Sequence, residues 1–305
     1  MPQDFDVIVI GCGVAGLSAA RACLRNGLRT ATFESLLPGG LVLNVNHLDG
    51  EIRGSGMDFA TDLMTEIGTL GGENVSGTVA ALRPEGGGFV VSSDAGEHRA
   101  GAIIVASGAK IRRLGIPGEA EMEGRGVSQC ADCDGPMFQG QDVMVVGGGD
   151  SALQEALALS SYARRIHLLH RGTQFRARGH FVDAIKADPK ISVRMRTVAE
   201  AVLGSQSVEA VRVRDLQKGE TSEIPSAGFF AFVGLEPVCG FVPAAAARDA
   251  NGCLVVDAVM CTMMPGVYAA GAVRSGYGGL LTQAVADGVA AASAAKSALV
   301  RSIRT

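Results

Sequence analysis

Residues 6–27 read DVIVIGCGVAGLSAARACLRNG, and residues 142–159 read DVMVVGGGDSALQEALAL. Each stretch consists of a short apolar run rich in β-branched residues, a glycine-rich turn and a helical run. Strands of this kind are typical of a parallel sheet that is buried on both faces. A second strand-like run follows in both cases, TATFE at 30–34 and RIHLLH at 165–170. The repeated pattern predicts an α/β protein with two Rossmann-like nucleotide-binding domains.

The first glycine-rich turn has the spacing GxGxxG. The first glycine permits the tight turn, the second lets the backbone approach a pyrophosphate, and the third lets the helix pack on the strand. Glu34 ends the next strand at the distance expected for an acid that binds ribose hydroxyls. We therefore expect a dinucleotide here rather than an ordinary turn, and Cys12 inside the turn is expected to be a small buried residue. The predicted binding residues are Gly11, Gly13, Val14, Ala15, Gly16 and Glu34.

The second turn has the accepted variant GxGxxA, and the strand after it ends in His170 and Arg171 rather than in an acid. Arg176 and Arg178 follow shortly afterwards. A carboxylate at this place would repel a 2′-phosphate, whereas guanidinium groups bind it with charge-assisted contacts. The turn therefore favours NADPH over NADH; the alternative is that these arginines only solvate the start of a helix. The predicted binding residues are Gly147, Gly149, Asp150, Ser151, Ala152, His170, Arg171 and Arg176.

The stretch PGVYAAGAV at 265–273 predicts a further strand and turn, and an alanine-rich helix follows it. This part can return to complete the first domain. The predicted domains are then 1–113 joined with 241–305, and an inserted domain at 114–240.

The formal net charge of −4 gives no reason to expect nucleic acid or an anionic membrane as a partner. The absence of a signal-like or spanning segment predicts a cytoplasmic protein.

The stretch CADCDG at 130–135 places two cysteines at the CxxC spacing. This spacing serves zinc sites, structural disulfides and redox-active dithiols. In a reducing compartment a CxxC is catalytic or metal-binding more often than structural.

The region around this motif is similar to a known family. The stretch GVSQCADCDGPMFQGQDVMVVGGGDSALQEALALS, followed by HRGTQFRA, strongly resembles the low-molecular-weight bacterial thioredoxin reductases. So do IIVASGAKIRRLGIPGE at 103–119, FVGLEP at 232–237 and the stretch at 265–273. The resemblance implies a homodimer, an FAD domain split by an inserted NADPH domain, and a rotation between domains that presents the nicotinamide and the dithiol to the flavin in turn. It also implies electron transfer from NADPH through FAD and the dithiol to thioredoxin or a thioredoxin-like protein.

Carried over to this sequence, the resemblance makes Cys133 the thiol that faces the flavin and Cys130 the thiol that attacks the partner disulfide. Asp134 would manage the thiol protons, which agrees with its chemistry, because an adjacent carboxylate disfavours a thiolate and suits a proton carrier. Structural zinc would need further ligands at a regular spacing, and the remaining cysteines do not offer it. The redox dithiol is therefore favoured over zinc and over an inert pair, and no metal is expected.

The resemblance also places FAD contacts at Gly40, Leu41, His47, Ser107, Gly108, Gly271, Ala272, Thr282, Gln283 and Ala284. Several of these depart from the family pattern, which makes the chain an atypical member. The family has an acid at Ala272, an asparagine at His47 and an arginine at Thr282, and its GGQL stretch appears here as GGLV at 39–42. One of three cations is missing at Gly172. We expect FAD to stay bound in a remodelled flavin pocket, with weaker NADPH affinity or relaxed specificity.

These departures leave alternatives to the NADPH-dependent reductase. One is an FAD-dependent dithiol oxidase that acts on a small molecule with oxygen as acceptor. Another is a related enzyme with a reductant other than NADPH. The third is a flavoprotein kept as a binding or regulatory subunit, against which the intact CxxC argues.

Overall fold

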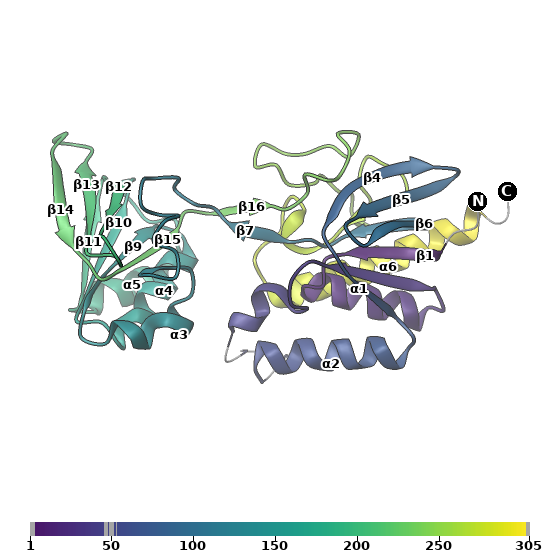
Figure 1. The fold of residues 1–305 in the computed structure, drawn as a ribbon, viewed down its shortest axis with the longest axis horizontal. Coiled ribbons are helices and arrows are strands. Elements are labelled where there is room, and N and C mark those ends of the chain that lie inside the picture. The colour runs from purple at the N-terminus through teal and green to yellow at the C-terminus, as the bar shows by residue number, and fades with distance from the viewer. Residues whose placement is uncertain (1–3, 46–47, 49–51, 53, 303–305) are drawn as a thin grey trace. The chain divides into compact units, whose positions relative to one another are not determined.

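The computed structural model describes residues 4–45, 48, 52 and 54–302. The chain forms two compact units, one made of Met1–Lys110 with Glu236–Thr305 and the other of Ile111–Leu235. In the chain, the second unit thus lies between the two segments of the first. The two crossings between them, β7 (Ala109–Ile111) and β16 (Leu235–Pro237), pair as a two-stranded sheet (Figure 1).

The first unit is built on a seven-stranded sheet with the strand order β3-β2-β1-β6-β5-β4, in which β17 also pairs with β6. The pairs that involve β1, β2, β3 and β17 are parallel, and β4 and β5 add an antiparallel ribbon on β6. Its strands are β1 (Phe5–Ile10), β2 (Thr30–Glu34), β3 (Glu73–Ser76), β4 (Val79–Glu85), β5 (Gly88–Ser93), β6 (Gly96–Val105) and β17 (Val267–Ala269).

Each face of this sheet is covered by a different layer, because successive side chains of a strand point to opposite faces. Val7 and Val9 pack with helices α1 (Val14–Arg25), α2 (Gly56–Thr69) and α6 (Leu281–Ser302). Ile8 and Ile10 pack with β4, β5 and the chain between 239 and 267. The apolar run of β1 is therefore buried on both faces, which is why apolar and polar residues do not alternate along it.

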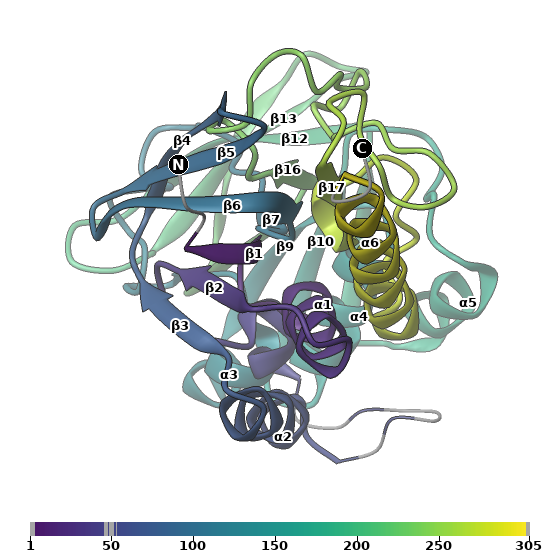
Figure 2. The ribbon, with the colours of Figure 1, turned by 90° about the vertical axis from the view of Figure 1, so that its right-hand side faces the viewer.

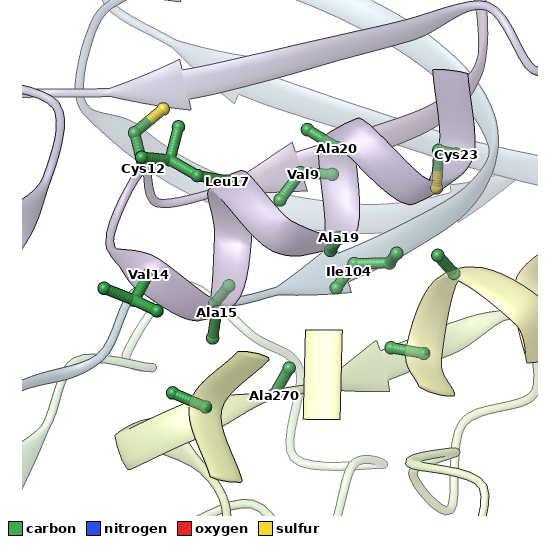
Figure 3. Packing of buried hydrophobic residues seen from close by; sticks show 14 of the residues in the cluster. Val9, Cys12, Val14, Ala15, Leu17, Ala19, Ala20, Cys23, Ile104 and Ala270 are labelled. Atoms are coloured by element: carbon green, nitrogen blue, oxygen red, sulfur yellow. The ribbon is translucent and has the colours of Figure 1, made fainter. Parts of the chain in front are cut away.

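Small side chains let the helices of this layer lie close together. Figure 2 shows α1 and α6 side by side, and their contact is the most extensive between any two named elements. Figure 3 shows Ala15, Ala19 and Ala20 of α1 among the buried residues, together with Val9 and Ile104 from the sheet. This packing fixes α1 at the end of β1, where the first glycine-rich turn joins them.

Two 3₁₀ turns complete the unit, η1 (Gly40–Asn44) and η3 (Gly271–Val273).

The second unit repeats the design with a five-stranded parallel sheet in the order β11-β10-β9-β15-β8. One face is covered by an antiparallel sheet of β12, β13 and β14, and the other by three helices and a 3₁₀ turn. The strands are β8 (Val127–Ser128), β9 (Asp142–Gly147), β10 (Arg165–His170), β11 (Ile191–Met195), β12 (Thr197–Leu203), β13 (Ala210–Asp215), β14 (Thr221–Pro225) and β15 (Gly228–Phe232). The helical elements are α3 (Ala131–Asp134), η2 (Gly135–Phe138), α4 (Asp150–Ser160) and α5 (Gly179–Ala187).

Both units thus have three layers, a helical one, a parallel sheet and an antiparallel one, which confirms the predicted pair of Rossmann-like domains. Within the described part of the chain, no helix combines the length and the apolar character that crossing a membrane requires.

Candidate active site

The first glycine-rich turn connects β1 to α1, and two of its glycines are required by close approaches. Gly11 has φ +102°, and a Cβ placed on it would lie 2.5 Å from the Ala106 carbonyl oxygen. A Cβ on Gly16 would lie 1.9 Å from the Gly11 carbonyl oxygen. Gly13, in contrast, would meet nothing within 4 Å. The space above Gly13 is therefore open, as the approach of a pyrophosphate requires.

The start of α1 fits a phosphate group. Gly13 is the N-cap and makes no side-chain cap bond, and the first turn contains no acid. The free N–H groups of such a helix start, with the positive end of its dipole, favour an anion. Val14 and Ala15, the first residues of this helix, are buried against the sheet and hold it in place. The residues present therefore fit the pyrophosphate of FAD.

Glu34 reaches back from the end of β2 to the first turn. Its Oε2 accepts the Cys12 N–H at 2.8 Å, and its Oε1 accepts the N–H groups of Ser35 and Leu36 at 2.9 and 3.0 Å. A carboxylate has about four acceptor positions, so one remains for a ribose hydroxyl. Cys12 itself is 0% exposed, and burial raises the pKa of its thiol to about 12. The prediction that Cys12 is a buried residue of the turn is confirmed.

Three of the residues predicted to contact FAD lie in segments that pack on this turn. The N–H of Gly39 donates to the Cys12 carbonyl at 2.7 Å, which brings the start of η1, with Gly40 and the half-exposed Leu41, against the turn. Ser107 follows β6, and its Cα would lie 2.7 Å from a Cβ on Gly11. His47 lies outside the described residues.

The crossing back into the first unit is held beside Ser107 and Gly108. The Val238 N–H donates to the Gly108 carbonyl at 3.0 Å, and the Ser107 hydroxyl donates to the Val238 carbonyl. These two residues therefore support the chain that enters the first unit, in addition to their predicted place in the FAD site.

The remaining predicted FAD residues lie at η3 and at the start of α6. Ala272 is half-buried in η3, and no acid stands in its place. Thr282 is exposed and Ala284 is buried, both in the first turn of α6. The Gln283 Oε1 accepts the Gly278 N–H at 2.7 Å, which fixes the loop before the helix. These residues thus shape a turn that contains fewer charged groups than the family pattern.

A buried ion pair holds η3 against α6, and sequence reasoning missed it. Asp287 accepts hydrogen bonds from Arg274 Nε and Nη2 at 2.6 and 2.8 Å, and a third from the Gly271 N–H at 3.1 Å. Arg274 is 8% exposed and Asp287 is 4% exposed. The signal in the sequence was a single acid inside an apolar, alanine-rich helix, because a buried charge of this kind needs a partner.

The second glycine-rich turn, between β9 and α4, has a similarly open helix start. Gly149 is the N-cap without a side-chain cap bond, and a Cβ on it would meet nothing within 4 Å. Asp150 stands in the first turn of α4, but its carboxylate accepts the Arg178 N–H at 2.8 Å and Arg178 Nε at 2.6 Å. These bonds lower the pKa of the Asp150 carboxyl. Arg178 therefore forms an ion pair with Asp150 at the start of α4.

His170 ties the end of β10 to the second turn. Its ring is buried, with Nδ1 at 3.1 Å from the Gly147 carbonyl oxygen and Nε2 at 2.9 Å from that of Gln174. The tautomer of the ring decides which of the two nitrogens donates. His170 is thus a structural residue here and does not face outward as a ligand.

The two remaining arginines of this region are exposed, as phosphate binding requires. The Arg176 N–H donates to the Gly148 carbonyl at 2.7 Å, so the loop that carries it is fixed on the turn. The side chains of Arg171 and Arg176 are both exposed. Ser151 is also exposed at the start of α4, and Ala152 is buried beneath the turn. This set fits the pyrophosphate and 2′-phosphate of NADPH.

Cys130 and Cys133 form a disulfide at the start of the short helix α3. Cys130 is the N-cap, and its Sγ accepts the Cys133 N–H at 3.2 Å. The Cys130 N–H donates to the Ser128 hydroxyl at 3.2 Å, and the Asp134 N–H donates to the Cys130 carbonyl at 3.1 Å. Cys133 is exposed, while Cys130 and Asp134 are half-buried. The bonds of the Cys130 and Asp134 N–H groups do not involve the sulfurs, so opening of the disulfide does not require them to break.

A second residue that sequence reasoning missed contacts this helix. Glu155, on α4, accepts the Ala131 N–H at 2.7 Å.

In the part of the chain that the structure covers, no group of three or more histidine, cysteine or acidic side chains could hold a metal ion.

Comparison with known proteins agrees with this site. Residues 5–288 match the family model described as pyridine nucleotide-disulphide oxidoreductase. A thioredoxin reductase from Treponema pallidum is 37% identical over 301 residues, which cover 97% of this chain and 98% of that protein. The structure of Lactococcus lactis thioredoxin reductase in its FR conformation matches with a TM-score of 0.91 at 33% identity, covering 98% of this chain and all of that one. The structure of T. acidophilum thioredoxin reductase matches with a TM-score of 0.87 at 30% identity, covering 99% of this chain and all of that one. The chain therefore belongs to the thioredoxin reductases of low molecular weight within the pyridine nucleotide-disulphide oxidoreductase family.

Proposed function

We propose that this flavin-dependent disulfide reductase takes electrons from NADPH and delivers them to thioredoxin or a thioredoxin-like protein. The observation that carries the proposal is the Cys130–Cys133 disulfide, which lies in the same compact unit as the second nucleotide turn. We assign FAD to the first unit and NADPH to the second. When bound, these cofactors supply hydride transfer and the passage of two electrons to the disulfide.

The residues of the first unit bind FAD through its pyrophosphate and ribose. The open start of α1 accepts the phosphate charge, and Glu34 retains one acceptor position for a ribose hydroxyl. In the second unit the N–H groups at the open start of α4 donate to the phosphates of NADPH, and the guanidinium groups of Arg171 and Arg176 donate to its 2′-phosphate.

The dithiol passes the electrons on by thiol–disulfide exchange. Two electrons and one proton convert the disulfide into a Cys130 thiolate and a Cys133 thiol. The Cys133 N–H that already contacts Cys130 Sγ stabilises the thiolate. This thiolate attacks the partner disulfide, and one partner sulfur leaves as a thiolate. Cys133 then attacks the mixed disulfide, which restores the Cys130–Cys133 bond and releases the second partner sulfur, while Asp134 carries the proton.

Anaerobic mixing of the purified yellow protein with NADPH tests the proposal. Rapid bleaching of the flavin, followed by reduction of thioredoxin and a chromogenic disulfide, is the expected result. Bleaching by a dithiol but not by NADPH, with hydrogen peroxide formed in air, would instead identify a dithiol oxidase. The predicted homodimer and the cytoplasmic location stay predictions, and sedimentation of the holoenzyme tests the first.

Arginine replacements should reveal the basis of NADPH preference. Removal of Arg171 or Arg176 by alanine takes away a charge-assisted contact to the 2′-phosphate. Such contacts contribute about 1.5 to 3 kcal/mol. We expect the ratio of kcat/KM for NADPH to that for NADH to fall by about ten-fold or more for each variant. Arg164→Ala is the control, because this exposed arginine pairs with Asp142 and is not assigned to the nucleotide. If the ratio of kcat/KM for NADPH to that for NADH stayed unchanged in both variants, the two arginines would only be solvated surface residues.

Restoring the family's acid at position 272 should tighten FAD binding. Ala272→Asp adds a charged acceptor at η3, and a hydrogen bond to a charged group contributes about 1.5 to 3 kcal/mol. We expect the dissociation constant of FAD to fall by about ten-fold or more when apoprotein is titrated with FAD. Ala286→Asp, the same change at an exposed position of α6, should leave the constant unaltered. Equal effects of both changes would contradict a specific role for position 272.

A further inference from the structure

The peptide group directly after Cys130 is held by a carboxylate from another helix. The Ala131 N–H donates to Glu155 Oε2 at 2.7 Å, and Ala131 is 0% exposed. Ala131 is the first residue of α3, and the N–H at such a position has no acceptor within its own helix. The N-cap side chain does not serve it, because Cys130 Sγ accepts the Cys133 N–H instead. Glu155 therefore satisfies a buried donor that the dithiol helix leaves unpaired.

Glu155 is half-buried on the helix that follows the second nucleotide turn. It lies three residues after Ala152 and four before Leu159, so the three share one face of α4. Ala152 and Leu159 are both 0% exposed. A carboxylate in such a place is costly unless hydrogen bonds satisfy it. The contact with the Ala131 N–H supplies one such hydrogen bond.

The dithiol helix depends on contacts of this kind for its orientation. It spans only Ala131–Asp134, and a helix of one turn has too few hydrogen bonds to be stable by itself. The helical segment also packs closely on the end of α4, since a Cβ on Gly135 would lie 2.8 Å from Tyr162 Cδ2. When the disulfide opens, the covalent link between Cys130 and Cys133 is lost. The bond from Ala131 to Glu155 involves neither sulfur, so opening of the disulfide does not require it to break.

We propose that Glu155 is a positioning residue for the dithiol, whose carboxylate keeps the peptide after Cys130 in place while the sulfurs are separate. This inference rests on the proposed function. Glu155 acts through the backbone of Ala131, so it supports the exchange of Cys130 and Cys133 without taking part in it. Its effect should appear in the rate of electron delivery and not in the binding of either partner.

Two conservative variants separate the reach of the side chain from its charge. Glu155→Gln keeps the length and one oxygen acceptor but loses the charge. Glu155→Asp keeps the charge but is shorter by one CH₂ group and withdraws the oxygen from Ala131. The measurement is a single-turnover reaction, in which enzyme reduced by NADPH is mixed with increasing thioredoxin disulfide. Gln154→Asn is the matched control, because it shortens the exposed neighbouring side chain by the same CH₂ group.

We expect the limiting rate to fall by about ten-fold in Glu155→Asp, as loss of a hydrogen bond to a charged group would cause. The half-saturating thioredoxin concentration should stay the same. Glu155→Gln should remain within about three-fold of the parent, and Gln154→Asn should equal it. If Glu155→Asp does not fold, Glu155→Met, which fills a similar volume without an acceptor, is expected to show the same loss.

Three results would overturn the inference. They are a limiting rate in Glu155→Asp equal to that of the parent, a change confined to the half-saturating concentration, and an equal loss in Glu155→Gln. Failure of the proposed function looks different, because the parent enzyme would then not reduce thioredoxin at all. Flavin bleaching by NADPH at the parental rate in every variant shows that the nucleotide sites are intact.

Discussion

Replacement of Cys130 by serine should lower the rate of protein disulfide reduction by about 10³-fold or more, as removal of a covalent nucleophile does. Cys130 carries the sulfur that accepts the Cys133 N–H, and this bond favours its thiolate over that of its neighbour. The transfer of hydride from NADPH does not involve this sulfur. Anaerobic bleaching of the flavin by NADPH should therefore persist in the variant, while turnover with thioredoxin is lost.

The two cysteines can be assigned their roles by trapping. A thioredoxin variant with one active-site cysteine, labelled with 5-thio-2-nitrobenzoate, should form a mixed disulfide with reduced Cys133→Ser and release the coloured thiolate. Without Cys133 no thiol in the pair can resolve this adduct, so it should survive on a non-reducing gel. Cys130→Ser should form little of it. The reverse pattern would exchange the two roles. Cys261→Ser, which removes a free cysteine outside the pair, is the control and should retain parental turnover.

Loss of Asp287 should destabilise the first unit by about 3 to 5 kcal/mol, because Asp287→Ala leaves the buried Arg274 guanidinium without its partner. The Gly271 N–H would lose its acceptor at the same time, which loosens η3 against α6. Urea unfolding of the holoenzyme should therefore show a lower free energy of unfolding, together with easier release of FAD on ultrafiltration.

Two comparisons show whether the effect belongs to the buried pair. Glu223→Ala breaks the exposed ion pair with Arg212 and should change the free energy of unfolding by no more than about 1 kcal/mol. The double variant Arg274→Met with Asp287→Leu removes both charges and should recover much of the stability. A double variant as unstable as Asp287→Ala would mean that packing volume, rather than an unpaired charge, causes the loss.

Several properties of the site follow from sequence spacing alone. The turn between β1 and α1 must carry glycine at Gly11 and Gly16, because the backbone passes too close for a side chain at both positions. The apolar run of β1 predicted a strand buried on both faces, and the structure confirms it. The place of Cys130 and Cys133 before the second turn could also be predicted. Their CxxC spacing brings the two sulfurs into bonding distance on one helical turn.

Other contacts could not be predicted, because they join residues that are far apart in the chain. No local sequence pattern indicates that such residues meet in the fold. Arg178 was a candidate cation for NADPH, but its bond to Asp150, 28 residues away in the chain, was not predicted. Glu34 was predicted from its place at the strand end, yet its bond to the Cys12 N–H, 22 residues away, was not. Each of these contacts depends on how a loop folds back over the sheet.

Patterns in the sequence predicted the two Rossmann-like units and the place of the dithiol. These follow from local rules, since the alternation of strands, the period of helices and the steric limits of the backbone all act within about twenty residues. In contrast, the carboxylates that bind other groups of the protein could be identified only from the folded structure. Glu155 meets Ala131, and Asp287 meets Arg274, because the packing of helices brings their faces together. A buried charge must find a partner, but the partner is chosen by the geometry of packing, which no local spacing records.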